Sequence, residues 1–178
     1  MGQPRMGKTR LAALAAQKLL SPWNSVTVIH VDAVRRELHM HTPWMGFATE
    51  VEPWRQRELE YVCLDRALSA GADVAIIEGN GISPYTVDET ISPDVKVLVA
   101  RVNTSPAEIL RVSKEHAVPG WWGEPKSDTY MLHLLTQYSS YSDIWCRDFP
   151  DIVCDTTDLD EGISSACGRI CSELGLEG

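Results

Sequence analysis

The sequence predicts an α/β fold with three layers, α/β/α, in which helices cover both faces of a parallel sheet. Short β-branched runs alternate with segments of helical periodicity along the chain. The runs are apolar throughout, which is typical of strands that are buried on both faces of a parallel sheet. A chain of 178 residues is long enough for one compact domain and marginal for two. We therefore expect a single domain over residues 1–178.

The first half of the chain contains two expected helices and two expected strands. Residues 9–20 carry leucine and alanine at helical spacing. Residues 26–31 form a β-branched run, which favours a strand. The segment 53–69 opens with a proline, which suits the first turn of a helix. Residues 73–77 are again apolar and β-branched, and they predict the second strand.

The second half repeats the alternation. Residues 95–100 predict a third strand. Ser105, Pro106 and Glu108 form a capping box, with a hydroxyl cap, proline in the first turn and glutamate three residues on. Three further elements are expected in order: a helix at 127–138, a strand at 151–154 and a terminal helix at 158–174.

Charge and composition exclude several classes of partner. Lys and Arg number 16 and Asp and Glu number 25, so the formal net charge is −9. A general nucleic-acid binder would show a basic footprint instead. No apolar stretch approaches the roughly 20 residues of a membrane span, so we expect no membrane partner. The short apolar run 11–16 after Arg5, Lys8 and Arg10 is explained by the first helix rather than by a signal peptide, which indicates a cytoplasmic protein.

The amino-terminal residues match the phosphate-binding pattern Gly-x4-Gly-Lys-Thr. The matching residues are Gly2, Gln3, Pro4, Arg5, Met6, Gly7, Lys8 and Thr9. The glycines permit a tight loop whose N–H groups point at phosphate oxygens. Lys8 supplies a positive charge to the β- and γ-phosphates, Thr9 can ligate Mg²⁺, and the following helix directs its positive dipole end at the same anion. The predicted cofactors are therefore ATP and Mg²⁺.

The chain begins at this loop, so the strand that normally precedes it is not in the sequence. In a parallel sheet that strand lies near the centre, and its omission is expected to leave a gap about two strand spacings wide. A late start site, a truncated chain and a fragment all fit this observation. A degenerate protein without activity is a further alternative.

The motifs and their order resemble P-loop kinases of the nucleoside-monophosphate-kinase-like group, such as shikimate, gluconate, zeta-toxin-type and 2-phosphoglycerate kinases. The resemblance rests on the loop 2–9, His30-Val31-Asp32-Ala33-Val34-Arg35-Arg36, Ile76-Ile77-Glu78-Gly79-Asn80-Gly81, Arg101 to Pro106 with Arg111 and Lys114, and Val153 to Leu159. No Asn-Lys-x-Asp motif of GTPases occurs. The resemblance implies a P-loop NTPase fold and ATP-dependent transfer of the γ-phosphoryl group to a hydroxyl or phosphate of a small-molecule acceptor. The alternative is a nucleotide-binding module, regulatory or partner-binding, that transfers no phosphate.

The resemblance also assigns roles at two strand ends. Asp32 would orient the acceptor hydroxyl or take its proton, and Arg35 would hold an anionic group of the acceptor. Their alternative is a helix-capping aspartate followed by solvated arginines. Glu78 resembles the acidic residue that holds Mg²⁺ directly or through water. Gly79, Asn80 and Gly81 would let substrate approach the backbone, unless they form only a strand-to-helix turn.

Further along the chain, the resemblance implies a lid at about 111–126 and a base-binding segment. Arg111 and Lys114 would neutralise charge on the transferring phosphoryl group, with Arg101 as a third candidate. A solvated helix face explains Arg111 and Lys114 as well. Asp155 and Thr156 correspond to residues beside the adenine. The irregular region 32–52, rich in His, Trp, Pro and Met, is a candidate substrate-facing segment.

Overall fold

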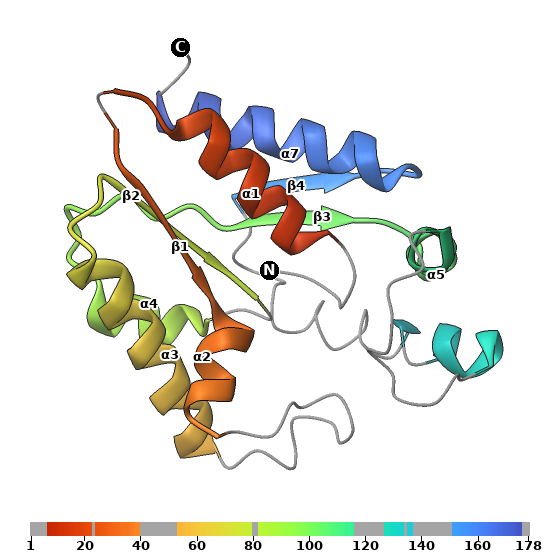
Figure 1. Cartoon of the computed structure of the whole chain (residues 1–178), viewed down its shortest axis with the longest axis horizontal. Helices are drawn as coiled ribbons and strands as arrows, with labels where there is room; N and C mark the ends of the chain where they lie inside the picture. Colours follow the sequence, from red (N-terminus) through yellow and green to blue (C-terminus); the bar gives the residue numbers. More distant parts are fainter. Residues whose placement is uncertain are drawn as a thin grey trace. The chain divides into compact units, whose positions relative to one another are not determined.

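The computed structural model of the chain describes residues 7–22, 24–39, 53–79, 82–115, 127–133, 135–136 and 151–175. The chain divides into two compact units, of which one is Ala12–Val97 and the other combines Met1–Leu11 with Leu98–Gly178. Each unit contains one parallel pair of strands and its own helices (Figure 1). The expected single domain over 1–178 stays a prediction.

The unit Ala12–Val97 is built on strands β1 (Val26–His30) and β2 (Val74–Glu78), which pair in parallel along their whole length. Its helices are α2 (Val31–Glu37), α3 (Pro53–Ser69) and α4 (Pro84–Thr90), and it also holds most of α1 (Lys8–Leu19). Asp73 fixes the start of the pair, since its Oδ2 accepts hydrogen bonds from the backbone N–H of Ser25 at 2.8 Å and from its hydroxyl at 2.7 Å. The two strands therefore reach the same edge of the sheet together.

The core of this unit lies between the strands and α3. Val31, Val34, Leu59 and Cys63 are buried there, and partly buried apolar side chains from both strands pack around them. Leu59 and Cys63 are four residues apart, so they lie on one face of α3. This buried face leaves the opposite face of α3 to solvent, where the sequence is charged and aromatic.

The second unit is built on β3 (Ala100–Asn103) and β4 (Ile152–Asp155), again a parallel pair. The helix α7 (Leu159–Leu174) packs against both strands, and α5 (Pro106–Glu115) contacts α7 (Figure 1). Residues 128–133 and 135–136 are helical. Both strand pairs are parallel and both are covered by helices, which confirms the predicted α/β class.

One local prediction was wrong in part, and two helices were not predicted. The strand expected at 95–100 begins only at Ala100, because β4 offers ladder partners from Ile152 onward. The N–H of Val99, the residue before Ala100, donates to the side chain of Asp151 at 2.7 Å rather than to a strand partner. The sequence analysis also missed α2, which follows β1 without a loop, and α4, whose first residue is a proline.

The starts of α5 and α7 follow the expected cap chemistry. Ser105 Oγ accepts the N–H of Glu108 at 3.1 Å, as a capping box requires. In a complete capping box, the glutamate side chain also accepts the backbone N–H of the capping residue, here Ser105. This bond is not among the described contacts of Glu108, whose carboxylate binds Arg111 instead. Asp158 caps α7 by accepting two N–H groups, those of residues 160 and 161, at 2.9 and 3.0 Å.

Two glycines of α7 make a matched pair for a stability test. A Cβ at Gly162 would collide with Thr156 Cγ2 and lie 2.9 Å from Val102 Cγ1, whereas a Cβ at Gly168 would meet nothing within 4 Å. Alanine in a helix gains about 0.5–1 kcal/mol over glycine. Overpacking costs about 1–3 kcal/mol. We expect urea denaturation to show that Gly168→Ala raises the free energy of unfolding and that Gly162→Ala lowers it. Equal stabilisation by both would contradict the tight packing.

Candidate functional site

The start of α1 has the geometry of an anion site. Gly7 has φ 65°, a left-handed conformation that favours glycine. A Cβ there would also collide with the side chain of Ile163 in α7. The carbonyl of Gly7 accepts the N–H of Leu11 at 2.8 Å, so the helical hydrogen bonds begin at this residue. The first turn of α1 contains Lys8 and Thr9 and no acidic residue, which favours bound negative charge.

Other contacts hold this turn in place. Arg10 forms an ion pair with Asp160 in the first turn of α7. Together with the approach of Gly7 to Ile163, this contact fixes the start of α1 against the start of α7. Residues 2–6 of the predicted loop, Gly2, Gln3, Pro4, Arg5 and Met6, lie outside the described residues. The sequence placed the helix start correctly to within one residue.

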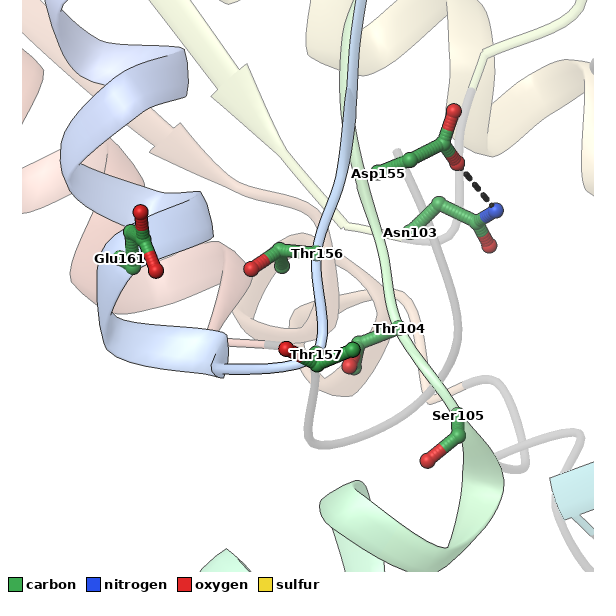
Figure 2. A pocket seen from close by; sticks show the side chains of 7 residues that line it. All are labelled: Asn103, Thr104, Ser105, Asp155, Thr156, Thr157 and Glu161. Carbon is green, nitrogen blue, oxygen red and sulfur yellow. Dashed lines mark hydrogen bonds between the residues drawn. The ribbon is translucent and has the colours of Figure 1, made fainter.

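A shallow polar pocket lies at the carboxyl ends of β3 and β4 (Figure 2). It is lined by Asn103, Thr104, Ser105, Asp155, Thr156, Thr157 and Glu161. Open α/β proteins bind ligands at this end of their strands. The amide of Asn103 donates to Asp155 Oδ1 at 2.6 Å (Figure 2), which fixes two side chains at the pocket wall. The pocket includes both residues predicted to lie beside the adenine.

Thr104, one of the residues that line the pocket, carries a buried polar group. The residue is only 7% exposed, and within the described part of the chain its buried Oγ1 makes no hydrogen bond. A buried hydroxyl without a partner costs about 1–3 kcal/mol. The side chains that line the pocket carry hydroxyl, amide or carboxylate groups. The residues of the pocket therefore fit a polar ligand.

In the unit Ala12–Val97, Asp32 and Arg35 form one ion pair. Asp32 lies in the first turn of α2, directly after β1, and its side chain is 64% exposed. Arg35 Nη1 donates to Asp32 Oδ1 at 2.8 Å, although the Arg35 side chain is only 4% exposed. His30, rather than Asp32, occupies the N-cap of α2. The alternative of a capping aspartate followed by solvated arginines therefore does not describe Asp32, which is not the N-cap, or Arg35, which is buried. Of the two arginines, only Arg36 is exposed.

The ends of β1 and β2 bring together a pair that the sequence analysis missed. His30 Nδ1 lies 2.9 Å from Glu78 Oε1, and the two residues face each other in the parallel register. Each is the last residue of its strand, and this shared position is the sequence feature from which the pair could have been predicted. A Cβ at Gly79 would lie 2.6 Å from Val31 Cβ, so the turn after β2 passes close to the start of α2. Asn80 and Gly81 lie outside the described residues.

The expected lid cations occur in ion pairs on or near α5. Arg111 contacts Glu108 at 2.7 Å and Glu115 at 2.6 Å, both on its own helix. Lys114 forms an ion pair with Asp128. Hydrogen bonding to Arg111 lowers the pKa of Glu108, and the two carboxylates raise the pKa of Arg111. An incoming phosphate would have to compete with these carboxylates for Arg111.

Arg101 and the rest of the predicted lid complete the survey of predicted cations. Arg101 is 6% exposed on β3, with Nη2 3.5 Å from Asn103 Oδ1. It is therefore a buried neighbour of the pocket residue Asn103 rather than a solvated cation. Residues 116–126 of the lid and 40–52 of the substrate-facing segment lie outside the described residues.

Replacing Arg111 tests the carboxylate pairing directly. In Arg111→Met we expect the pKa of Glu108 to rise toward its ordinary value near 4.5, because its main hydrogen-bond donor is lost. The pKa of Glu108 is lower in the folded state than in the unfolded state, so the pair of Glu108 and Arg111 stabilises the fold at pH values above 4.5. This stabilisation is lost as the pH falls through the folded-state pKa. Carboxyl NMR titration measures the change. Lys114→Met is the control and should leave Glu108 unchanged.

Several other site types receive no support within the described ranges. No cluster of three or more metal-ligating side chains occurs there. None of the described helices combines the length and apolar character that a membrane span requires. Cys63, Cys154, Cys167 and Cys171 are free and buried, and burial raises the pKa of Cys63 to about 11. These thiols therefore have the environment of core residues.

Comparison with known proteins identifies the fold. No protein-family model matches the chain, and no curated protein matches it by sequence. Among solved structures, the chain is similar to a shikimate kinase from Bacteroides thetaiotaomicron, with a TM-score of 0.66 and 20% sequence identity. The match covers 99% of this chain and 96% of that one. The chain thus shares the α/β fold of that structure, and this confirms the predicted fold class.

Proposed function

We propose that the protein is an ATP-dependent small-molecule kinase, which transfers the γ-phosphoryl group to an acceptor hydroxyl or phosphate. The observation that carries the proposal is the start of α1. There a glycine in a left-handed conformation is followed by Lys8 and Thr9, in a turn without acidic side chains. The shikimate kinase-like fold supports the same conclusion.

The donor nucleotide would be held by residues of the predicted loop and of the pocket. In the proposal, the loop amides and Lys8 bind the β- and γ-phosphates, while Asp155 and Thr156 bind the base and sugar end. Thr9 and Glu78 are the proposed protein ligands of Mg²⁺, with Glu78 acting directly or through a water. When bound, Mg²⁺ neutralises phosphate charge.

The acceptor would be held by Asp32, Arg35 and the segment Gly79 to Gly81. Asp32 suits the role of orienting the acceptor hydroxyl, because its carboxylate is exposed and is held by a buried guanidinium. That burial supports a second role for Arg35, which is to fix the orientation of Asp32 as well as to attract an anionic acceptor group. Arg111 would stabilise charge on the transferring group.

The proposed step is a single in-line displacement. The acceptor oxygen forms a bond to the γ-phosphorus, and the bond from that phosphorus to the bridging oxygen breaks. The electron pair of the broken bond remains on ADP. For a hydroxyl acceptor, Asp32 receives the proton. Catalysis is mostly positioning and charge neutralisation.

A panel of small hydroxylated acceptors, incubated with Mg·ATP, tests this proposal. The measurement is ADP release above the background without acceptor, with an EDTA control. We expect one chemical class of acceptor to stimulate release, and ATP to raise the melting temperature. Nucleotide binding without stimulation across sugar acids, phosphoglycerates, nucleotides and amino sugars favours the nucleotide-binding module. Absence of both effects would overturn the nucleotide proposal itself.

A further inference from the structure

A histidine and a glutamate end neighbouring strands and share one hydrogen bond. His30 is the last residue of β1, Glu78 is the last residue of β2, and the parallel register pairs them directly. His30 Nδ1 lies 2.9 Å from Glu78 Oε1. An ionised carboxylate can only accept hydrogen bonds, so the imidazole donates from Nδ1. The contact therefore fixes one carboxylate oxygen of Glu78 and one orientation of the ring.

Helix capping does not explain the orientation of His30. The residue is the N-cap of α2, a position whose side chain commonly accepts a backbone N–H from the first turn. Among the described contacts, the His30 side chain makes no such cap hydrogen bond. Its Nδ1 faces the neighbouring strand instead, where it meets Glu78. The ring is thus directed toward the carboxylate and not toward the helix that it opens.

The backbone just after this pair is closely packed. A Cβ at Gly79 would lie 2.6 Å from Val31 Cβ, and Val31 is a buried member of the core of its unit. The Glu78 side chain is 12% exposed, whereas the His30 side chain is 47% exposed. The carboxylate is therefore mostly enclosed at a well-packed edge of the sheet, and the more exposed imidazole lies beside it.

The other acidic side chain at this edge is held in a similar way. Asp32 lies two residues after His30, and its Oδ1 accepts a hydrogen bond from Arg35 Nη1 at 2.8 Å. The segment 30–35 thus supplies a nitrogen donor to each of the two carboxylates, those of Asp32 and Glu78. Donors of this kind hold ligating carboxylates in their working orientation, and their loss typically costs about 10–100-fold in metal affinity or activity.

We propose that His30 is a positioning residue of the phosphoryl-transfer site, which holds Glu78 in the orientation that binds Mg²⁺ directly or through a water. The inference rests on the proposed function, in which Glu78 is a protein ligand of Mg²⁺. A carboxylate oxygen is the hard donor that Mg²⁺ takes. The hydrogen bond from His30 restricts the rotation that would turn this carboxylate away from the metal. In this role His30 acts through Glu78 and has no contact with the metal.

Nitrogen-15 NMR on the full chain without nucleotide tests the geometry. We expect the neutral ring of His30 to carry its proton on Nδ1, because that atom faces the Glu78 carboxylate. Glu78→Met removes the acceptor and should abolish this preference. A wild-type ring whose proton lies on Nε2 would overturn the proposal, whatever the variants do.

Calorimetry with Mg·ATP and with metal-free ATP in EDTA tests the role. His30→Leu should lower the preference for Mg·ATP over metal-free ATP by about 10–100-fold and leave the affinity for metal-free ATP unchanged. His30→Asn should retain the preference, because Asn Nδ2 occupies the position of His Nδ1 and can donate to Glu78. His133→Leu makes the same chemical change at another exposed histidine and should have no effect. Circular dichroism verifies that each variant remains folded.

The proposed function and the role of His30 can fail separately in this experiment. A wild type that binds no nucleotide overturns the proposed function, and this inference with it. A wild type that binds Mg·ATP, together with a folded His30→Leu variant of equal metal preference, overturns only the role of His30. The same conclusion follows if His30→Asn loses the preference as fully as His30→Leu, because the loss is then unrelated to the donor.

Discussion

Asp32→Asn is expected to reduce acceptor-stimulated ADP release by about 10²–10⁴-fold, the usual contribution of a positioned proton acceptor. The amide retains an oxygen for the hydrogen bond from Arg35 Nη1, which is 2.8 Å from Asp32 Oδ1. It lacks the basicity that the transfer step needs. ATP affinity, measured by calorimetry, should be unchanged. The measurement requires an acceptor identified by the panel described above.

The buried guanidinium of Arg35 determines which substitutions are informative at Asp32. Asp32→Ala would remove the partner of a side chain that is 4% exposed, and a buried charge without its partner is costly. A loss of activity in that variant would therefore combine a chemical and a structural effect. Asn and Ala should be compared by thermal melting, and Asn should melt closer to the wild type. If Asp32→Asn retains full acceptor-dependent turnover, Asp32 is not the proton acceptor.

The sequence was sufficient to predict the elements whose signals are local. The helix after the loop, the positions of the strands β1 and β2, and the cap of α7 are all indicated by residues within a few positions of each other. The strand at 95–100 was wrong because strand formation needs a partner. The apolar residues before Ala100 satisfy the local pattern, but β4 begins at Ile152 and pairs only from Ala100 onward.

The candidate site was predictable only one residue at a time. Asp32 and Glu78 were singled out from their places after apolar strands. The contact of His30 with Glu78 depends on strand register, and the burial of Arg35 depends on how α2 packs against α3. Likewise, Arg111 was expected as a cation for phosphate. Its ion pairs with Glu108 and Glu115 follow from helical spacing of three and four residues, which the sequence contained.

Lys8→Met is expected to lower kcat/KM for acceptor phosphorylation by about 10²–10³-fold, comparable with losing one preorganised oxyanion donor. Methionine retains the length and much of the packing of the lysine stem but removes the charge. Lys8 opens α1 next to Gly7, where the helix dipole already favours an anion. The charge should matter more as the phosphoryl group moves than in the ground state. Most of the loss should therefore appear in kcat, with a smaller loss of ATP affinity.

Lys18→Met is the matched control, because it makes the same chemical change in the last turn of α1. It should leave kcat/KM and ATP affinity unchanged, since the opposite end of a helix attracts cations rather than phosphate. Urea denaturation verifies that both variants remain folded, since both substitutions preserve helix propensity. If Lys8→Met and Lys18→Met have equal activity, then the start of α1 does not bind the triphosphate. The donor would then have to be held elsewhere in the fold.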